Sequence, residues 1–408
     1  MSSRTKHSLD EAWLTPEFLA NPYPHYQRLR MEAPVFWSER LSSWVLTRYA
    51  DVVAALRDST RLSNAGRMAA LLDKLPETLR PNLQLLYDHY SVGLIFSDPP
   101  DHTRLRALVT KAFTPAMIER MRPRIQAFVH QLLDTVAGQR QMDVIADFAY
   151  PLPATVICDM LGLPQADRAQ FRAWTDDIIG LLGAGASAER AERGQRSLRG
   201  MREYFQVLIR ERRAHPGEDL MSALIQAYEQ GQRLSEAELL STSVTLLTAG
   251  QETTTSLISN GLLALFHHPA QLQLLKNNPA LSSSAIEEFL RYDASVQRQL
   301  RLVTTDFELG GHHIRRGEIV SPFLAAANRD PAQFSEPDEL DITRTENRHL
   351  AFGYGVHFCL GAPLARLEAP IAFTALLERF PNLRLTDEPL EYKADITVRG
   401  LKALPVEF

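Results

Sequence analysis

The pattern of hydrophobic and polar positions predicts a chain that is mainly helical, with strands on both sides of a long helical stretch. The segment NPYPHYQRLRMEAPVFW predicts a short helix leading into a strand, and SWVLTRY alternates as a second strand does. Helical periodicity dominates from about residue 101 to 292 and returns at about 360–380. Strand patterns occupy about 30–50, 296–325 and 382–408, and Gly310–Gly311 suits a hairpin turn. Because helical and strand-rich regions interleave, we predict a mainly α (α+β) fold in a single domain, residues 1–408.

Two stretches depart from this regular pattern. Residues 61–100 carry leucine and methionine at helical spacing but are interrupted by prolines, which predicts a partly helical connection with an apolar face. Residues 328–350, NRDPAQFSEPDELDITRTENRHL, are rich in Asp, Asn and Pro and show no period. An irregular stretch of this length inside a compact protein is usually functional.

Composition and charge narrow the class of protein. With 45% hydrophobic and 23% charged residues and a net charge of −5, the chain carries no basic footprint for nucleic acid. The N-terminus lacks the apolar core of a signal peptide, and no apolar run is long enough to span a membrane. Cys158 and Cys359 are the two cysteines, too few for a disulfide framework. We therefore expect a cytoplasmic protein without a membrane anchor, with Cys158 as a small buried core residue.

One apparent motif is discounted. GAGASA, residues 183–188, fits the dinucleotide-binding pattern G-x-G-x-x-A, but AWTDDIIGLL before it is helical in pattern. That fingerprint needs a preceding strand, so a loop between two helices is the better interpretation.

Cys359 lies in AFGYGVHFCLGAPLAR, between glycines and a predicted helix. The free N–H groups of a helix start favour a thiolate, and Pro363 is tolerated in the first turn. Glycines at 353, 355 and 361 allow close approach of a flat or bulky group. Taken alone, the cysteine could be a nucleophile, a redox sensor or a ligand of a metal in a cofactor.

The segment FGYGVHFCLG resembles the haem-binding signature of the cytochromes P-450, F-G-x-G-x-H-x-C-x-G, at every fixed position. Three further motifs follow the family's order and spacing, so the resemblance covers nearly the whole chain. It implies the family's fold and haem (heme b, iron protoporphyrin IX), with Cys359 as the metal ligand and Phe352, Gly353 and Gly361 at the cofactor. Pro370, inside the following helix, departs from the family and predicts a local bend near Arg366–Pro370.

The first further motif is AGQETT, residues 249–254, in a helix predicted from Ser235 to Phe266 that spans about 48 Å. Glycine and consecutive threonines are poor helix formers, which often marks a functional position. A buried polar cluster bonded to its own backbone is the alternative. The resemblance implies that Glu252 and Thr253 supply protons for oxygen activation.

The other two motifs carry charge. EEFLR places Glu288 and Arg291 on one helical face, either as a surface ion pair or, as the resemblance implies, as a buried structural cluster with Arg344. HTRLR places His102 and Arg106 one turn apart, where both can grip one anion. By resemblance these two, with Arg301 and His357, hold the haem propionates. Arg104 is expected to face solvent, where it could serve a redox-partner surface.

The resemblance implies a monomeric haem-thiolate monooxygenase of secondary metabolism. It would insert one atom of O2 into a hydrophobic small molecule by hydroxylation or epoxidation. Electrons would come from NAD(P)H through a ferredoxin and a ferredoxin reductase. A peroxide-driven peroxygenase and a non-catalytic haem-thiolate sensor or carrier are the alternatives. Macrolides, terpenoids, steroids and fatty acyl compounds are candidate substrates. The residues expected to line the pocket are Leu94, Ile95, Leu246, Ala249, Val296, Gln299 and Val398.

Overall fold

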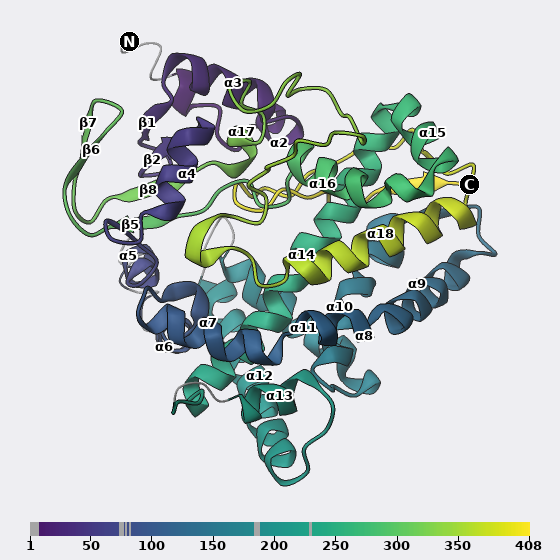
Figure 1. Cartoon of the computed structure of the whole chain (residues 1–408), viewed down its shortest axis with the longest axis horizontal. Coiled ribbons are helices and arrows are strands. Elements are labelled where there is room, and N and C mark those ends of the chain that lie inside the picture. Colours follow the sequence, from purple (N-terminus) through teal and green to yellow (C-terminus); the bar gives the residue numbers. More distant parts are fainter. Residues whose placement is uncertain (1–7, 73–76, 78–79, 81–82, 183–187, 228–230) are drawn as a thin grey trace. The chain divides into compact units, whose positions relative to one another are not determined.

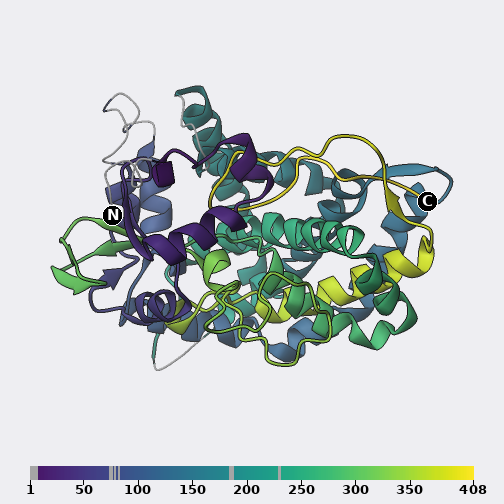
Figure 2. The same cartoon turned by 90° about the horizontal axis from the view of Figure 1, so that it is seen from above.

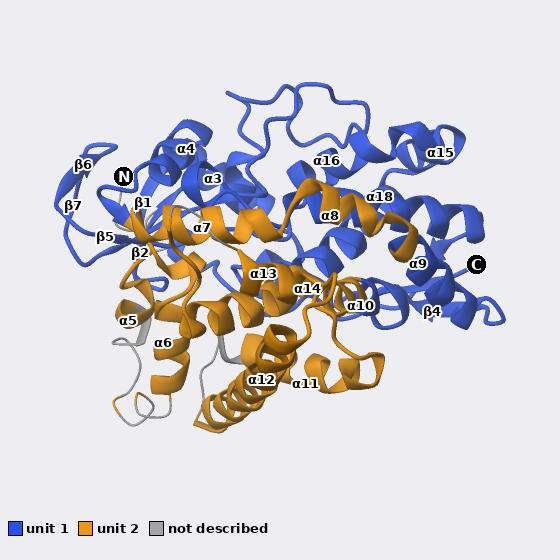
Figure 3. Cartoon of the chain, turned by 60° about the horizontal axis from the view of Figure 1, so that its bottom comes forward, with its two compact units in different colours: residues 1–62, 125–152, 253–408 blue, residues 63–124, 153–252 orange. Residues whose placement is uncertain are grey.

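The computed structural model describes residues 8–72, 77, 80, 83–182, 188–227 and 231–408. Contacts divide the chain into two compact units that interleave in sequence (Figure 3). Unit 1 holds residues 1–62, 125–152 and 253–408, and unit 2 holds residues 63–124 and 153–252. The single-domain boundary drawn from the sequence stays a prediction. No helix within the described ranges has both the length and the apolar character needed to cross a membrane.

The largest sheet has the strand order β1-β2-β8-β5-β3. Its strands are β1 Val35–Ser38, β2 Ser43–Leu46, β8 Ile319–Pro322, β5 Arg301–Val303 and β3 Leu62–Ser63. β2 pairs antiparallel with β1 and parallel with β8, so segments far apart in the sequence share one sheet. Val35, Leu46 and Val320 from these strands pack with helical Val52 and Ala327 in one apolar core. The predicted strand regions near 30–50 and 296–325 are confirmed.

Two smaller sheets complete unit 1. β6 Phe307–Leu309 and β7 His312–Ile314 form a hairpin around Gly310 and Gly311, whose φ angles of 58° and 76° suit glycine. The second sheet has the order β4-β10-β9, with β4 Gln141–Asp143, β10 Pro405–Glu407 and β9 Arg384–Leu385. β4 was not predicted, because three residues are too few to show a period.

The following α-helices lie in unit 1 wholly or for the most part; Figure 1 labels them and Figure 3 shows the units. They are α2 Pro16–Ala20, α3 Tyr23–Glu32, α4 Tyr49–Arg57, α9 Arg122–Val136, α15 Pro269–Asn277, α16 Ser282–Tyr292, α17 Leu324–Ala327 and α18 Ala362–Arg379. Short turns of other helix types lie at η3 Ile145–Ala149, η5 Pro279–Leu281 and η6 Gly355–His357. α18 continues through Pro370, so the proline does not end the helix, and the bend stays a prediction.

α14 Glu236–His267 contributes residues to both units and is one unbroken helix, as Figures 1 and 2 show. In unit 1 it packs closely through Gly261. A Cβ at this glycine would lie 2.7 Å from the Phe289 ring of α16 and 2.9 Å from the Phe373 ring of α18. Only a residue without a side chain fits there, which brings the three helices together.

The regular structure of unit 2 in its described part is almost all helical, and Ser63 of β3 also belongs to it. Its helices are α5 Arg67–Leu72, α6 Gln84–Ser91, η2 Leu94–Phe96, α7 Asp101–Ala112, α8 Pro115–Arg120, α10 Pro151–Met160, η4 Gln165–Asp167, α11 Arg168–Leu182, α12 Ala188–Ala214 and α13 Leu220–Gln226. The partly helical connection predicted over 61–100 appears as α5, α6 and η2. Residues 183–187 of the discounted glycine motif lie outside the described residues, between α11 and α12. Cys158 is 2% exposed, as predicted.

Candidate active site

Cys359 is half-buried at the end of a tight loop in unit 1. Its backbone N–H donates to the carbonyl oxygen of Phe352 at 2.9 Å, which closes the loop. Gly353 and Gly355 both have φ of 72°, and a Cβ at Gly355 would lie 2.9 Å from the Leu56 carbonyl oxygen of α4. The two glycines are therefore required by backbone conformation, and the second also by close packing.

The helix after the cysteine begins close to the predicted position, about residue 360. α18 starts at Ala362, with Gly361 as its N-cap and a proline in the first turn. A short turn separates the cysteine from the first helical residue, and a Cβ at Gly361 would lie 3.8 Å from the Cys359 sulfur. The sulfur is thus close to the backbone that enters the positive end of the helix.

Arg301 of β5 is 3% exposed and lies in the same unit as the cysteine loop. Its Nη2 donates to Oε1 of Gln299 at 2.7 Å, and its Nη1 donates to the Leu300 carbonyl oxygen at 2.9 Å. The Gln299 Nε2 atom lies 2.8 Å from where a Cβ on Gly353 would stand. Gln299, predicted as a pocket residue, therefore orients Arg301 against the glycine loop. Sequence reasoning missed this contact, and the i, i+2 spacing of the two residues was its only signal.

Two predicted pocket residues of unit 1, Val296 and Val398, are brought together by an antiparallel β-bridge. The Ser295 hydroxyl donates to the Thr253 carbonyl oxygen on α14 at 2.8 Å. Both valines remain half-buried. The segment beginning at Ser295 is therefore tied to the helix that carries the predicted oxygen-activation residues.

In unit 2, α14 has an accessible stretch between buried neighbours. Ala249 and Gly250 are exposed, whereas Thr248 is 8% and Gln251 2% exposed. A Cβ at Gly250 would meet nothing within 4 Å, so open space lies beside the helix here. The remaining predicted pocket residues of this unit are also accessible: Leu246 and Leu94 are half-buried, and Ile95 is 38% exposed. Glu252 and Thr253 follow in the unbroken helix, on the two sides of the boundary between the units.

His102 and Arg106 both lie on α7, with His102 1% exposed and Arg106 half-buried. Burial, and secondly the charge of Arg106, lower the pKa of His102 to about 4, although the charge of Asp98 opposes both. A nearby anion would reverse that balance. Arg104, expected to face solvent, is 28% exposed and forms an ion pair with Glu238 of α14 within unit 2.

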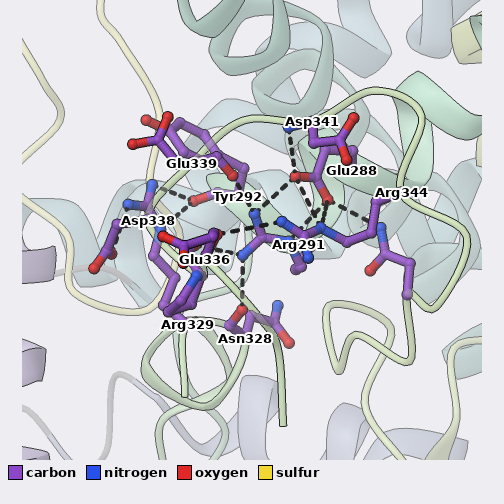
Figure 4. Close-up of polar contacts among 12 residues, drawn as sticks. Glu288, Arg291, Tyr292, Asn328, Arg329, Glu336, Asp338, Glu339, Asp341 and Arg344 are labelled. Carbon is purple, nitrogen blue, oxygen red and sulfur yellow. Dashed lines mark hydrogen bonds and ion pairs between the residues drawn. The ribbon is translucent and has the colours of Figure 1, made fainter. Parts of the chain in front are cut away.

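Glu288, Arg291 and Arg344 meet in one cluster in unit 1 (Figure 4). Arg291 is fully buried and donates to both Glu288 carboxylate oxygens, at 2.8 and 2.7 Å. Its other N–H groups donate to the carbonyl oxygens of Asn328, Pro337 and Glu339 at 2.6–3.1 Å. All five guanidinium donors are used, so the arginine fixes the irregular segment over 328–350.

The comparisons with known proteins agree with this architecture. The family model described as Cytochrome P450 matches residues 70–398. Cytochrome P450 CYP107DY1 of Priestia megaterium is 47% identical over 374 residues, covering 90% of this chain and 90% of the relative.

Among solved structures, P450BioI in complex with hexadec-9Z-enoic acid ligated acyl carrier protein has a TM-score of 0.86 and 40% identity. The match covers 96% of this chain and 99% of that one. PksS, the bacillaene polyketide synthase cytochrome P450 of Bacillus subtilis 168, has a TM-score of 0.87 and 39% identity, over 97% and 98% of the two chains.

The chain therefore belongs to the cytochrome P450 family and is a P450 monooxygenase with haem (iron protoporphyrin IX) as its cofactor. Its residues fit this group on structural grounds. Within unit 1, a half-buried thiol on a glycine loop can approach iron, and the buried guanidinium of Arg301 suits a carboxylate.

Proposed function

We propose that this P450 inserts one atom of O2 into a hydrophobic small molecule of secondary metabolism, by hydroxylation or epoxidation. Its electrons would come from NAD(P)H through a separate ferredoxin and ferredoxin reductase. The observation that carries the proposal is the half-buried thiol of Cys359, held on a loop by its N–H bond to Phe352 at the entry to α18.

In this proposal Cys359 holds the haem iron as a thiolate. When bound, the haem supplies the activation of dioxygen and the transfer of one oxygen atom to the substrate. Phe352, Gly353 and Gly361 keep the sulfur's side of the site closely packed. Binding of the haem carboxylates is assigned to His102, Arg106, Arg301 and His357, because buried anions need paired cations.

Glu252 and Thr253 are proposed to move protons toward the reacting oxygen. Both are half-buried on α14, so they can exchange protons with solvent without opening the helix. The Thr253 carbonyl oxygen accepts the Ser295 hydroxyl, which fixes the backbone position of the threonine. Splitting an O–O bond to release water consumes two protons, and Glu252 and Thr253 would control their delivery.

The proposed substrate is apolar, since accessible Leu94, Ile95 and Leu246 offer it hydrophobic contacts. Two related proteins indicate which class of substrate should be tested first. The P450BioI structure holds a hexadecenoic acid on acyl carrier protein, and PksS belongs to a polyketide synthase. Long acyl and polyketide chains, free or carried by an acyl carrier protein, are therefore the leading candidates.

The ligand assignment is tested by the ferrous carbonyl spectrum of the haem-loaded protein. The wild type and Cys158→Ser should both give the thiolate-type spectrum, since Cys158 is a buried core residue. Cys359→Ser should lose it. A thiolate spectrum in Cys359→Ser, or a histidine-type spectrum in the wild type, would overturn the proposal.

The reaction is tested in two stages. A panel of acyl, polyketide, macrolide, steroid and terpenoid compounds is screened for the shift of the haem from low to high spin. Those that bind are incubated with NADPH, ferredoxin and reductase, or with hydrogen peroxide alone. Oxygenated product only in the first mixture is expected, and product only with peroxide would contradict the proposed electron source.

A further inference from the structure

A second polar cluster lies against the cysteine loop, built on the glutamate next to Glu288. Glu287 of α16 accepts two parallel hydrogen bonds from Arg366 of α18, with Nε to Oε1 at 2.7 Å and Nη2 to Oε2 at 2.8 Å. His349 Nε2 also bonds to Glu287 Oε2, at 3.0 Å. A carboxylate gripped by both arms of a guanidinium has a fixed orientation. We call Glu287, His349 and Arg366 the Glu287 cluster.

The Glu287 cluster holds the aromatic residue to which the cysteine backbone is bonded. The guanidinium carbon of Arg366 lies 4.7 Å from the centroid of the Phe352 ring, and the His349 ring centroid lies 5.8 Å from it. The Phe352 carbonyl oxygen accepts the Cys359 N–H. A continuous series of contacts therefore runs from Glu287 through Arg366 and Phe352 to Cys359.

The charges in the cluster have a definite order. The Nδ1 atom of His349 accepts the Ala351 N–H at 3.2 Å, so both ring nitrogens of His349 are engaged, Nδ1 with Ala351 and Nε2 with Glu287. Burial raises the pKa of Glu287, but hydrogen bonds from Arg366 and His349 outweigh it and bring the pKa to about 2. Glu287 is thus an anion and Arg366 a cation.

The positive member of the cluster, Arg366, is also the one whose guanidinium lies over Phe352 of the cysteine loop. The pKa of Arg366 is raised, first by its hydrogen bonds to Glu287 and further by the charge of Cys359. The Arg366 side chain is 40% exposed and that of Glu287 is 29% exposed, so water screens both charges in part. Arg366 therefore places a positive charge against the cysteine loop, and Glu287 partly balances that charge.

We propose that the Glu287 cluster is a positioning device for the thiolate, which fixes Phe352 and sets the reduction potential of the haem through the charge of Arg366. Reduction adds an electron, so a positive charge beside the sulfur favours the reduced state. Hydrogen bonding and charge around a metal ligand are known ways by which proteins tune a metal. This inference rests on the proposed binding of haem iron by Cys359.

The test measures the reduction potential of the haem-loaded full-length protein against a redox dye. Arg366→Leu removes the positive charge and should lower the equilibrium constant for reduction about tenfold, which is about 59 mV for one electron. Glu287→Gln leaves Arg366 unbalanced and should raise the constant, by about threefold. Shifts in opposite directions are expected only if charge acts on the site, because simple loosening of the loop would move both variants in the same direction.

Two further variants complete the design. Arg366→Lys keeps the charge but loses the two-armed grip, so its potential should stay near that of the wild type. Arg379→Leu is the matched control. It removes an exposed arginine from the same helix, paired with Asp134 and about 20 Å further along. Its potential should be unchanged.

The outcomes separate the two proposals. If the wild type gives the thiolate spectrum but Arg366→Leu and Glu287→Gln shift together or not at all, the inference is wrong. If the wild type lacks the thiolate spectrum, the proposed function fails instead. Should Arg366→Leu not bind haem, the other two variants decide: a raised constant in Glu287→Gln with a wild-type value in Arg366→Lys supports the inference, and any other pair of values refutes it.

Discussion

Glu287 and Glu288 are neighbours on α16, and each binds an arginine with both carboxylate oxygens, yet their surroundings differ. The Glu288–Arg291 pair is fully buried, and every donor of Arg291 is used. The Glu287–Arg366 pair is 29% and 40% exposed. Glu288 binds Arg291, which is bonded to three carbonyl oxygens of the irregular segment over 328–350, whereas Glu287 binds Arg366, which lies over Phe352 of the Cys359 loop.

The difference shows how burial decides whether a glutamate–arginine pair mainly stabilises the fold or mainly acts on a neighbouring group. A buried pair cannot lose one member cheaply, because the remaining charge has no water to solvate it. A half-exposed pair contributes less to stability, but its charge still acts on a neighbour at short range. We therefore expect the Glu288 cluster to govern folding and the Glu287 cluster to govern the properties of the site.

The largest expected effect is that of Glu288→Gln. Glutamine keeps the shape but leaves the buried Arg291 without a counter-charge, so the free energy of unfolding should fall by about 3–5 kcal/mol. Urea unfolding, followed by circular dichroism, measures it. A loss below about 1 kcal/mol in the free energy of unfolding would mean that the Glu288 cluster does not stabilise the fold more than the Glu287 cluster does.

Asn328→Ala should have an intermediate effect. The buried Asn328 Oδ1 accepts the Leu350 N–H at 2.6 Å, and alanine would leave that buried donor unsatisfied. We expect a loss of about 2 kcal/mol in the free energy of unfolding. Exposed Asn382→Ala is the control and should stay within about 0.5 kcal/mol of the wild type. Equal losses in both variants would remove the role given to Asn328.

Glu287→Gln should cost less, about 1 kcal/mol at neutral pH, because its ion pair is partly in water. Measured beside Glu288→Gln under identical conditions, it should retain most of the wild-type stability while its haem potential shifts. Equal destabilisation by the two substitutions would contradict the comparison.

The smallest expected effect is the pH dependence of the difference in stability between the wild type and Glu287→Gln. The folded pKa of Glu287, about 2, lies below its ordinary value of 4.5, so the unfolded chain takes up the proton first as pH falls. The stabilisation is therefore complete above about pH 5 and lost as pH falls toward 2. Thermal unfolding at pH 7, 5, 4 and 3 should show wild type and Glu287→Gln converging. A constant gap down to pH 3 would contradict the lowered pKa.

Much of the fold follows from local pattern. The periodicity predicted the long helix through AGQETT and the hairpin at Gly310–Gly311, because both depend on neighbours in sequence. The E-x-x-R spacing placed Glu288 and Arg291 on one face, and family resemblance supplied Arg344 as their partner. β4 was missed, since a strand of three residues is defined by its pairing with β10 and not by its own pattern.

The contacts around the cysteine were less predictable. Glu287 and Arg366 are 79 residues apart, and no local rule pairs them. Gln299 was assigned to the pocket from its position, and its hydrogen bond to Arg301 and its closeness to Gly353 became visible only in the structure. Sequence motifs specify which chemical groups a site uses. The side chains that orient those groups come from distant segments and are visible only once the chain is folded.

Gly261 has a consequence for how the enzyme can vary. Phe289 and Phe373 occupy the volume that any larger residue would need, so α14 cannot slide or rotate on α16 and α18 without a clash. Thr253 lies eight residues earlier on the same helix, a distance of about 12 Å along the helix axis. Substitutions along α14 can therefore change the side chains that meet a substrate while the backbone of the helix stays in place. Substrate specificity can then change while the position of Thr253 is kept.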